Sequence, residues 1–239
     1  MSSTSRGGKR SPTDYYGSPA WIVKRLLERC ALPSGRWLEP GAGEGNIIRA
    51  VNRVRQDVSW SAVELREECR PKLSTLVHQS QLITTDFLKG FTYQGSGWDV
   101  SITNPAFSIA QEYIEKTLTL AKWSVHLLRL NYLGTEGRNE FFQNNMPDIY
   151  VIPDRVSFAK SLSCRGALWP KCDWAEIVEL TTITPAVCPR CGGKIRISST
   201  DSIEYAWFVW GPSRNRRAGN IQVLAHTPLH ERQALLEAA

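Results

Sequence analysis

The chain has 239 residues, enough for one substantial core with a small appended module. Hydrophobic residues make up 42% and charged residues 22% of it, the ordinary proportions of a soluble globular protein. No apolar run approaches the ~20 residues that cross a bilayer, and the N-terminus lacks the apolar core of a secretory signal. We therefore expect a cytoplasmic protein with no membrane partner.

The net charge is +6 and the isoelectric point about 9.1, which suits a polyanionic partner without proving one. Six cysteines without a secretory context indicate reduced thiols or a metal site rather than a disulfide framework.

The N-terminal segment divides into an arm and a helix. Residues 1–13 are mostly Ser, Gly, Lys and Arg, and we expect a disordered basic arm there. The following residues predict a helix from about Ala20 to Cys30, with Ser18 as its N-cap and Pro19 in its first turn.

A glycine-rich turn comes next, after a short apolar strand at residues 35–38. The turn reads Glu39-Pro40-Gly41-Ala42-Gly43-Glu44-Gly45-Asn46, and residues 47–54 have helical spacing. A strand that turns through glycines into a helix brings a ligand close to the backbone. Position 46 is Asn, where the G-x-G-x-x-G motif of dinucleotide sites has its last Gly. The acidic Glu39 favours a cationic or hydroxyl-bearing ligand over a phosphate. A tight turn without any ligand is the alternative.

This turn closely resembles the cofactor loop of class I S-adenosylmethionine (SAM)-dependent methyltransferases. The resemblance implies that SAM is the cofactor. The cofactor-binding residues that it implies are Tyr16, Ser18, Glu39, Pro40, Gly41, Ala42, Gly43, Asn46, Glu64, Asp86, Phe87 and Asn104.

Acidic residues end the next two expected strands. Glu64 lies 19 residues after Gly45 (64 − 45), where a carboxylate accepts hydrogen bonds from ribose hydroxyls in a βαβ unit. A helix N-cap or a surface charge is the alternative. After an expected helix over residues 66–77, a strand over 81–86 ends in Asp86-Phe87. This pair resembles the family's acid that meets the adenine amino group and the aromatic that flanks the ring, although Asp86 alone could equally be a turn residue.

The fourth expected strand, residues 98–103, runs into Asn104-Pro105-Ala106-Phe107. Pro105 lacks an amide hydrogen and has a fixed φ, so the chain leaves the sheet sharply. The tetrapeptide resembles the N-P-P-F/Y catalytic loop of amino-group methyltransferases and departs from it at Ala106. An Asn-Pro turn alone is common. Here it follows an acidic glycine turn and strand-end acids, and the resemblance implies Asn104, Pro105 and Phe107 as catalytic residues.

The rest of the chain continues the alternation of strands and helices. Helices are expected over 109–121 and 134–145, and strands over 123–130, 149–153, 204–210 and 220–225. Such alternation predicts an α/β fold with helices on both faces of the sheet. We expect a Rossmann-like, mostly parallel, seven-stranded methyltransferase sheet, in which residues 204–210 form the antiparallel strand.

A Cys-rich insertion interrupts this pattern. We expect it over residues 159–202, with the methyltransferase domain formed by residues 14–158 and 203–239. The insertion contains Cys164, Cys172, Cys188 and Cys191.

The last two cysteines form a C-x-x-C-G-G knuckle, whose turn lets two thiolates face one metal. C-x-x-C is also a redox signature, but that chemistry needs a helix start, which Gly192-Gly193 disfavours. We favour one structural zinc on four cysteines, in a target-recognition module; two unliganded pairs are the alternative.

In their order, the motifs resemble adenine-N6 DNA methyltransferases, particularly the compact kind of phages and prophages, over roughly residues 14–158 and 203–225. The resemblance implies DNA as partner, with the target adenine flipped out of the duplex. Asn104 and the Pro105 carbonyl would accept the two amino hydrogens, and Phe107 would stack on the base. The alternatives are an RNA or protein-amide methyltransferase, and a non-catalytic zinc-containing nucleic-acid-binding protein in which Ala106 marks a decayed site.

Overall fold

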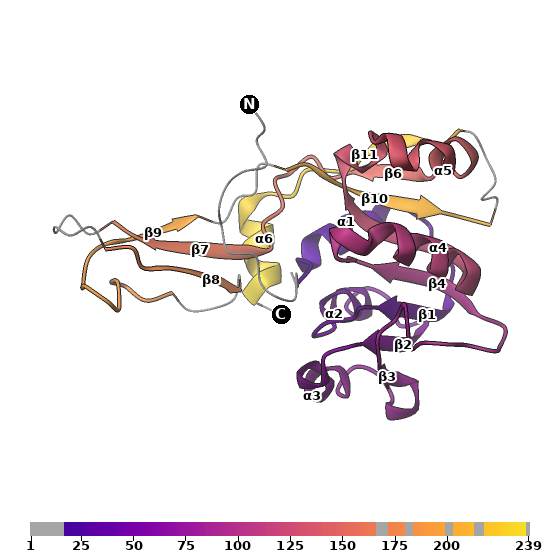
Figure 1. Cartoon of the computed structure of the whole chain (residues 1–239), viewed down its shortest axis with the longest axis horizontal. Helices are drawn as coiled ribbons and strands as arrows, with labels where there is room; N and C mark the ends of the chain where they lie inside the picture. Colours follow the sequence, from indigo (N-terminus) through magenta and orange to yellow (C-terminus); the bar gives the residue numbers. More distant parts are fainter. Residues whose placement is uncertain (1–16, 166–171, 180–183, 199–202, 213–217, 238–239) are drawn as a thin grey trace.

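A computed structural model of the chain describes residues 17–165, 172–179, 184–198, 203–212 and 218–237. The expected basic arm over residues 1–13 lies outside these ranges. The described residues form a large mixed sheet flanked by helices and a separate small sheet that projects from it (Figure 1).

The large sheet has eight strands in the order β11-β6-β10-β5-β4-β1-β2-β3. They are β1 (Gly35–Pro40), β2 (Val58–Glu64), β3 (Leu82–Thr84), β4 (Trp98–Thr103), β5 (Ala121–Arg129), β6 (Asp148–Val151), β10 (Tyr205–Trp210) and β11 (Ile221–Val223). Among these described strands, β10 alone is antiparallel to both of its neighbours. The sheet is therefore mostly parallel and Rossmann-like, as expected. The expected count of seven strands was wrong, because the short β11 pairs with β6 as an eighth.

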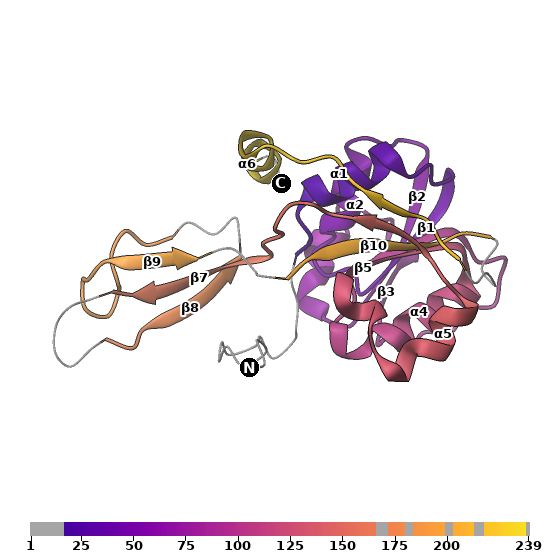
Figure 2. The ribbon, with the colours of Figure 1, turned by 90° about the horizontal axis from the view of Figure 1, so that it is seen from above.

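Helices cover both faces of this sheet. They are α1 (Ala20–Arg29), α2 (Asn46–Asn52), α3 (Arg70–Leu73), α4 (Ala110–Leu120), α5 (Asn139–Asn144) and α6 (Leu229–Glu237). Seen from above, α1 and α2 lie on one face and α4 and α5 on the other (Figure 2). Successive residues of β10 point to opposite faces, so Trp207 packs in the core under α1 and α2 while Phe208 packs in the core with α4 and α5. None of the described helices has the length and apolar character that crossing a membrane requires.

Two helix predictions need correction. The helix expected over residues 66–77 is a 3-10 turn, Glu67–Cys69, followed by the single turn α3. A continuous helix would need an amide hydrogen from Pro71 in its interior, whereas Pro71 is tolerated in the first turn of α3. The N-cap of α1 is Pro19, in an extended conformation and without a side-chain cap, rather than Ser18.

The insertion forms a second sheet that we had not predicted from its sequence. Its strands are β7 (Ala159–Cys164), β8 (Ala175–Glu179) and β9 (Ile195–Ser198), in the antiparallel order β8-β7-β9. The sheet lies between β6 and β10 in the chain and stands away from the large sheet (Figure 2). We call it the arm.

The C-terminal segment is fastened to the residues that lead into the arm. Asp154 follows β6 and is 7% exposed. Its Oδ1 accepts a hydrogen bond from Arg232 Nη2 at 2.6 Å and contacts His226 Nδ1, and its Oδ2 accepts from the Thr227 backbone N–H at 2.8 Å. One carboxylate thus holds α6 and the preceding loop in place.

Replacing Asp154 by Ala is expected to lower the free energy of unfolding by about 3 kcal/mol, because Arg232 and the Thr227 amide lose a buried charged acceptor. Urea denaturation measures this loss. Asp57→Ala is the control, since it breaks an ion pair with Arg55 whose Asp side chain is 50% exposed, and its effect should be far smaller. Equal losses in the two variants would contradict the fastening role.

Candidate active site

The glycine-rich turn lies at the carboxyl end of β1, where the chain enters α2. Gly41, Gly43 and Gly45 have φ values of 67°, 57° and 78°, in the left-handed region that residues with a Cβ rarely adopt. A Cβ on Gly45 would lie 2.6 Å from Leu76 Cδ1, and one on Gly41 would lie 3.3 Å from Tyr113 Oη. The turn therefore needs glycine both for its backbone conformation and for space.

Glu39 is buried beside this turn, with 3% of its surface exposed. Its Oε2 accepts a hydrogen bond from the Ile48 backbone N–H at 3.2 Å. The N-cap of α2 is Gly45, which has no side chain, so Glu39 satisfies one amide of the first turn instead. Burial, helped by the charge of Glu64, raises the pKa of Glu39 well above its usual range against the effect of the Ile48 bond. A cationic ligand would favour the ionised carboxylate.

Glu64, the last residue of β2, connects the turn to the neighbouring strand. Its Oε2 accepts a hydrogen bond from the Gly43 backbone N–H at 2.6 Å. Its Oε1 accepts from the Arg66 backbone N–H and from Arg66 Nε, both at 3.0 Å. Glu64 is 7% exposed, which excludes the surface-charge alternative. A carboxylate has about four lone-pair sites, so acceptor capacity remains for a ribose hydroxyl.

Glu64→Ala is expected to weaken SAM binding by about 1–3 kcal/mol, because the variant loses an ionised acceptor and frees the Gly43 amide. Isothermal calorimetry measures the affinity. Arg66→Ala serves as the control, since it removes the ion pair but leaves the carboxylate. If both variants lost the same affinity, the ion pair rather than the carboxylate would explain the effect.

The Asn104 loop lies beside the glycine turn, because β4 is the parallel neighbour of β1. Thr103 Oγ1 donates a buried hydrogen bond of 2.6 Å to the Pro40 backbone oxygen. This bond joins the residue before Asn104 to the residue before Gly41. The two loops that the sequence singled out therefore leave the sheet side by side at its carboxyl edge.

Phe107 opens a 3-10 turn, Phe107–Ile109, and packs near the end of β5. The Arg129 guanidinium carbon lies 4.5 Å from the Phe107 ring centroid, and the Tyr205 centroid lies 5.9 Å from it. Among the described residues, Arg129 Nε is buried without a hydrogen-bond partner. Arg129 belongs to no motif, so sequence reasoning missed it as a neighbour of the predicted catalytic loop.

Asp86 and Phe87 follow β3 and already have partners within the protein. Asp86 Oδ1 accepts hydrogen bonds from the Leu88 and Lys89 amides, at 2.8 and 3.1 Å. This is the turn role that we had left open for it. Phe87 is 2% exposed, and its ring centroid lies 4.9 Å from that of Tyr113. Their expected contacts with adenine stay predictions.

The other cofactor residues implied by the resemblance occupy the turn and its surroundings. Ala42 is 4% exposed, and its amide donates to the Val63 carbonyl at 3.1 Å. Asn46 Oδ1 accepts a hydrogen bond from Arg49 Nη2 at 3.1 Å. Ser18 is buried and precedes Pro19, the N-cap of α1, and Tyr16 lies outside the described residues.

Tyr113 of α4 is a further residue that the sequence did not reveal. It lies next to the glycine turn, where its hydroxyl would crowd a Cβ on Gly41, and packs on Phe87. Burial, followed by the charges of Glu64 and Asp86, raises the pKa of its hydroxyl. The side chain thus lies among the predicted cofactor residues, where helical periodicity had indicated only an amphipathic helix.

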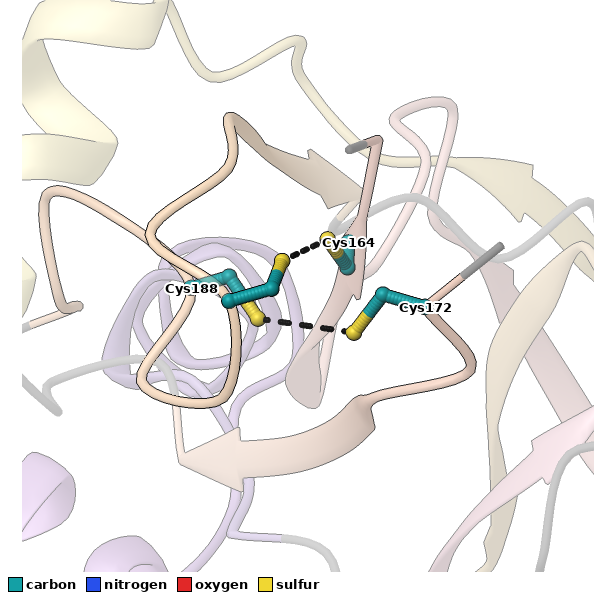
Figure 3. A group of neighbouring side chains, drawn as sticks. Cys164, Cys172 and Cys188 are labelled. Atoms are coloured by element: carbon teal, nitrogen blue, oxygen red, sulfur yellow. Dashed lines mark hydrogen bonds between the residues drawn. The ribbon is translucent and has the colours of Figure 1, made fainter. Parts of the chain in front are cut away.

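The four cysteines of the arm form a separate cluster, shown in Figure 3. All four Sγ atoms lie within 4.8 Å of one another. Cys164 Sγ is 3.3 Å from Cys191 Sγ, and Cys172 Sγ is 3.9 Å from Cys188 Sγ. Four sulfurs at about 2.3 Å from one zinc would be about 3.8 Å apart, so this set fits a tetrahedral ion.

The knuckle itself is held by the backbone. The Cys188 amide donates to the Gly193 carbonyl and the Gly192 amide to the Cys188 carbonyl, both at 2.8 Å, with Gly192 at a φ of 70°. Although burial opposes it, hydrogen bonds from the Arg190 and Cys191 amides lower the pKa of the Cys188 thiol to about 7. The surroundings of Cys188 therefore favour the thiolate that a metal requires.

Comparison with known proteins gives fold-level likeness. No family model and no curated protein matches the chain. A proposed RNA methyltransferase from Pyrococcus horikoshii is similar at 10% identity and a TM-score of 0.48, over 83% of this chain and 88% of that one.

Two further solved structures are similar at 13% identity. The 23S rRNA methyltransferase ErmE has a TM-score of 0.43, over 84% of this chain and 70% of its own. The precorrin-6y C5,15-methyltransferase from Geobacter metallireducens has a TM-score of 0.44, over 81% and 86%. Likeness at this level carries no conclusion about the substrate.

Proposed function

We propose that the protein is a SAM-dependent methyltransferase that modifies the exocyclic amino group of adenine in DNA. The observation that carries the proposal is the hydrogen bond from Thr103 to the Pro40 carbonyl, which holds the glycine turn and the Asn104 loop side by side. A cofactor on the first loop would then lie next to a target on the second. The basic overall charge favours a polyanionic substrate.

Methyl transfer to an amino nitrogen requires alignment of the nitrogen with the methyl group and does not require a strong base. SAM, when bound, supplies an electrophilic methyl group. Asn104 and the Pro105 carbonyl accept the amino hydrogens of adenine, which turns the nitrogen lone pair toward the methyl carbon. The nitrogen–carbon bond forms as the sulfur–carbon bond breaks, and the nitrogen then loses one proton to water. Positioning of this kind supplies most of the rate.

Phe107 provides the apolar surface on which the flipped base stacks. Its ring packs against the Arg129 guanidinium and the Tyr205 ring, so it has neighbours that limit its movement before a substrate arrives. The buried Glu39 and Glu64 serve the cofactor instead, through the turn amides and the remaining acceptor sites.

The four cysteines of the arm would hold one zinc ion with a structural role. Among the described aliphatic side chains of the arm, Leu162 is fully buried, whereas Ile197 is 52% exposed. A sheet of three short strands is marginal without a staple, and binding of zinc by four thiolates contributes folding free energy.

Mapping methylated bases in DNA from cells that express the protein tests the proposal directly. We expect N6-methyladenine at one sequence context, absent from cells that express Asn104→Ala. Incubation of the purified protein with labelled SAM and separate DNA, RNA and protein pools identifies the substrate class. Label in RNA or protein alone would refute the DNA assignment, and absence of SAM binding would leave the non-catalytic alternative.

A further inference from the structure

The arm is attached at the edge of the sheet where the candidate active site lies. It leaves the large sheet after the carboxyl end of β6 and returns at the start of β10. Tyr205, the first residue of β10, pairs with Arg129 and packs on Phe158 at 5.0 Å. Because Tyr205 also packs on Phe107, the base of the arm contacts the predicted catalytic loop.

The four cysteines lie at the other end of the arm. β7 leads away from the large sheet, and β8 and β9 run antiparallel to it (Figures 1 and 2). Cys164 ends β7, Cys172 precedes β8, and the knuckle precedes β9. The cysteine cluster is therefore at the tip of the arm, away from the predicted catalytic loop. A metal bound there would hold together the loops that form the tip.

One face of the tip is lined with exposed cations. Arg196 pairs with Ser163 across β9 and β7, so their side chains share a face. Two residues after Ser163 and two residues before Arg196, the Arg165 amide donates to the Lys194 carbonyl at 2.7 Å. Because side chains alternate along a strand, Arg165 and Lys194 lie on that face too. All three cations are exposed.

Arg190 of the knuckle is also exposed but pairs with Asp173. The charge at the tip decides how the cations can act. Among the described residues of the tip, Arg165, Arg190, Lys194 and Arg196 give +4, Asp173 gives −1, and zinc on four thiolates would give −2, so their sum is +1. Bulk attraction is therefore weak. The cations either contact phosphates individually or offset the thiolate charge.

We propose that Lys194 and Arg196 contact backbone phosphates of duplex DNA beside the flipped base. The proposal rests on the proposed function for DNA as the substrate. Flipping a base requires that the duplex next to it be held, and phosphate contacts from Lys and Arg fix position and register. The arm is rooted at the catalytic loop and presents these two exposed side chains beyond it, so a duplex lying along the arm reaches both.

The test compares two double variants of the full-length protein. Lys194→Gln with Arg196→Gln removes the proposed contacts. Lys122→Gln with Arg53→Gln removes two exposed cations from the opposite, amino edge of the sheet, at the start of β5 and after α2. Fluorescence anisotropy measures affinity for a labelled DNA duplex over a salt series, together with zinc content and SAM affinity.

We expect the arm variant to lose at least about tenfold in DNA affinity, and its salt slope to fall by about 2, one for each phosphate contact. Zinc content and SAM affinity should be unchanged, and the amino-edge variant should match the wild type. Unchanged DNA affinity and slope would overturn the proposal, as would loss of zinc, which would assign the cations to the thiolate centre. The same losses on an RNA duplex but not on DNA would overturn the choice of partner. Failure of the wild type to bind SAM would instead refute the proposed function. The two failures can be told apart, because the salt slope of DNA binding does not depend on SAM.

Discussion

Asn104→Ala should lower the rate of methyl transfer by at least about a hundredfold, the loss expected for one preorganised hydrogen-bonding group at the reacting centre. The side chain follows β4 directly, and the Thr103 bond fixes the start of its loop against the glycine turn. Removing the amide leaves the target nitrogen without one of its two acceptors. Single-turnover transfer from labelled SAM to DNA measures the effect.

The same variant should bind SAM with nearly wild-type affinity, because the proposed function assigns Asn104 to the amine and assigns the cofactor to Glu39 and Glu64, which contact the turn and the first turn of α2. Asn144→Ala is the matched control: Asn144 is exposed on α5 and its side chain donates to the Glu140 carbonyl within the same helix, so its loss should not change turnover. Comparable turnover in Asn104→Ala and wild type would remove Asn104 from the reaction.

The sequence identified the parts of the site that depend on local backbone chemistry. Glycines at positive φ, a carboxylate at a strand end and a proline that leaves the sheet each need a particular residue at a particular place. Their common location at one edge then follows from the parallel order of the strands. This is why Glu64 and Gly43, 21 residues apart, could be expected to lie together.

Contacts between distant elements were not predictable in the same way. Tyr113 reaches the glycine turn only because α4 packs back under it, and its periodicity fits any amphipathic helix. Asp154 meets Arg232 across 78 residues, and neither belongs to a motif. The broken helix after β2 differs from these contacts, since its cause, Pro71, is local and visible in the sequence.

The strands of the arm were hard to predict from the sequence for a third reason: they are short, and their sheet depends on the cysteines. Within β9, Ile195 and Ile197 alternate with polar residues, yet Ile197 is 52% exposed, so burial alone cannot specify the strand. The four-cysteine cluster at the tip supplies the missing constraint. Spacing alone left two unliganded pairs as an alternative, whereas the arrangement of all four Sγ atoms fits a single ion.

Changing Cys188 and Cys191 together to Ser should therefore abolish zinc binding and unfold the tip. Two of the four ligands are lost, and the remaining Cys164 and Cys172 cannot complete a tetrahedral site. Wild-type protein should contain about one zinc per chain by elemental analysis. The double variant should contain none and should lose DNA affinity at least as strongly as the Lys194 and Arg196 variant, while SAM affinity persists because the glycine turn lies in the other sheet.

A matched control uses the buried thiols outside the arm, since Cys30→Ser and Cys69→Ser leave the four cysteines of the arm untouched and should retain zinc. Wild-type protein free of zinc would refute the staple. Full DNA affinity and sequence selectivity in the metal-free double variant would refute its role in recognition. Loss of SAM binding along with the zinc would show that the arm and the cofactor site fold as one unit, against the independence that the two separate sheets imply.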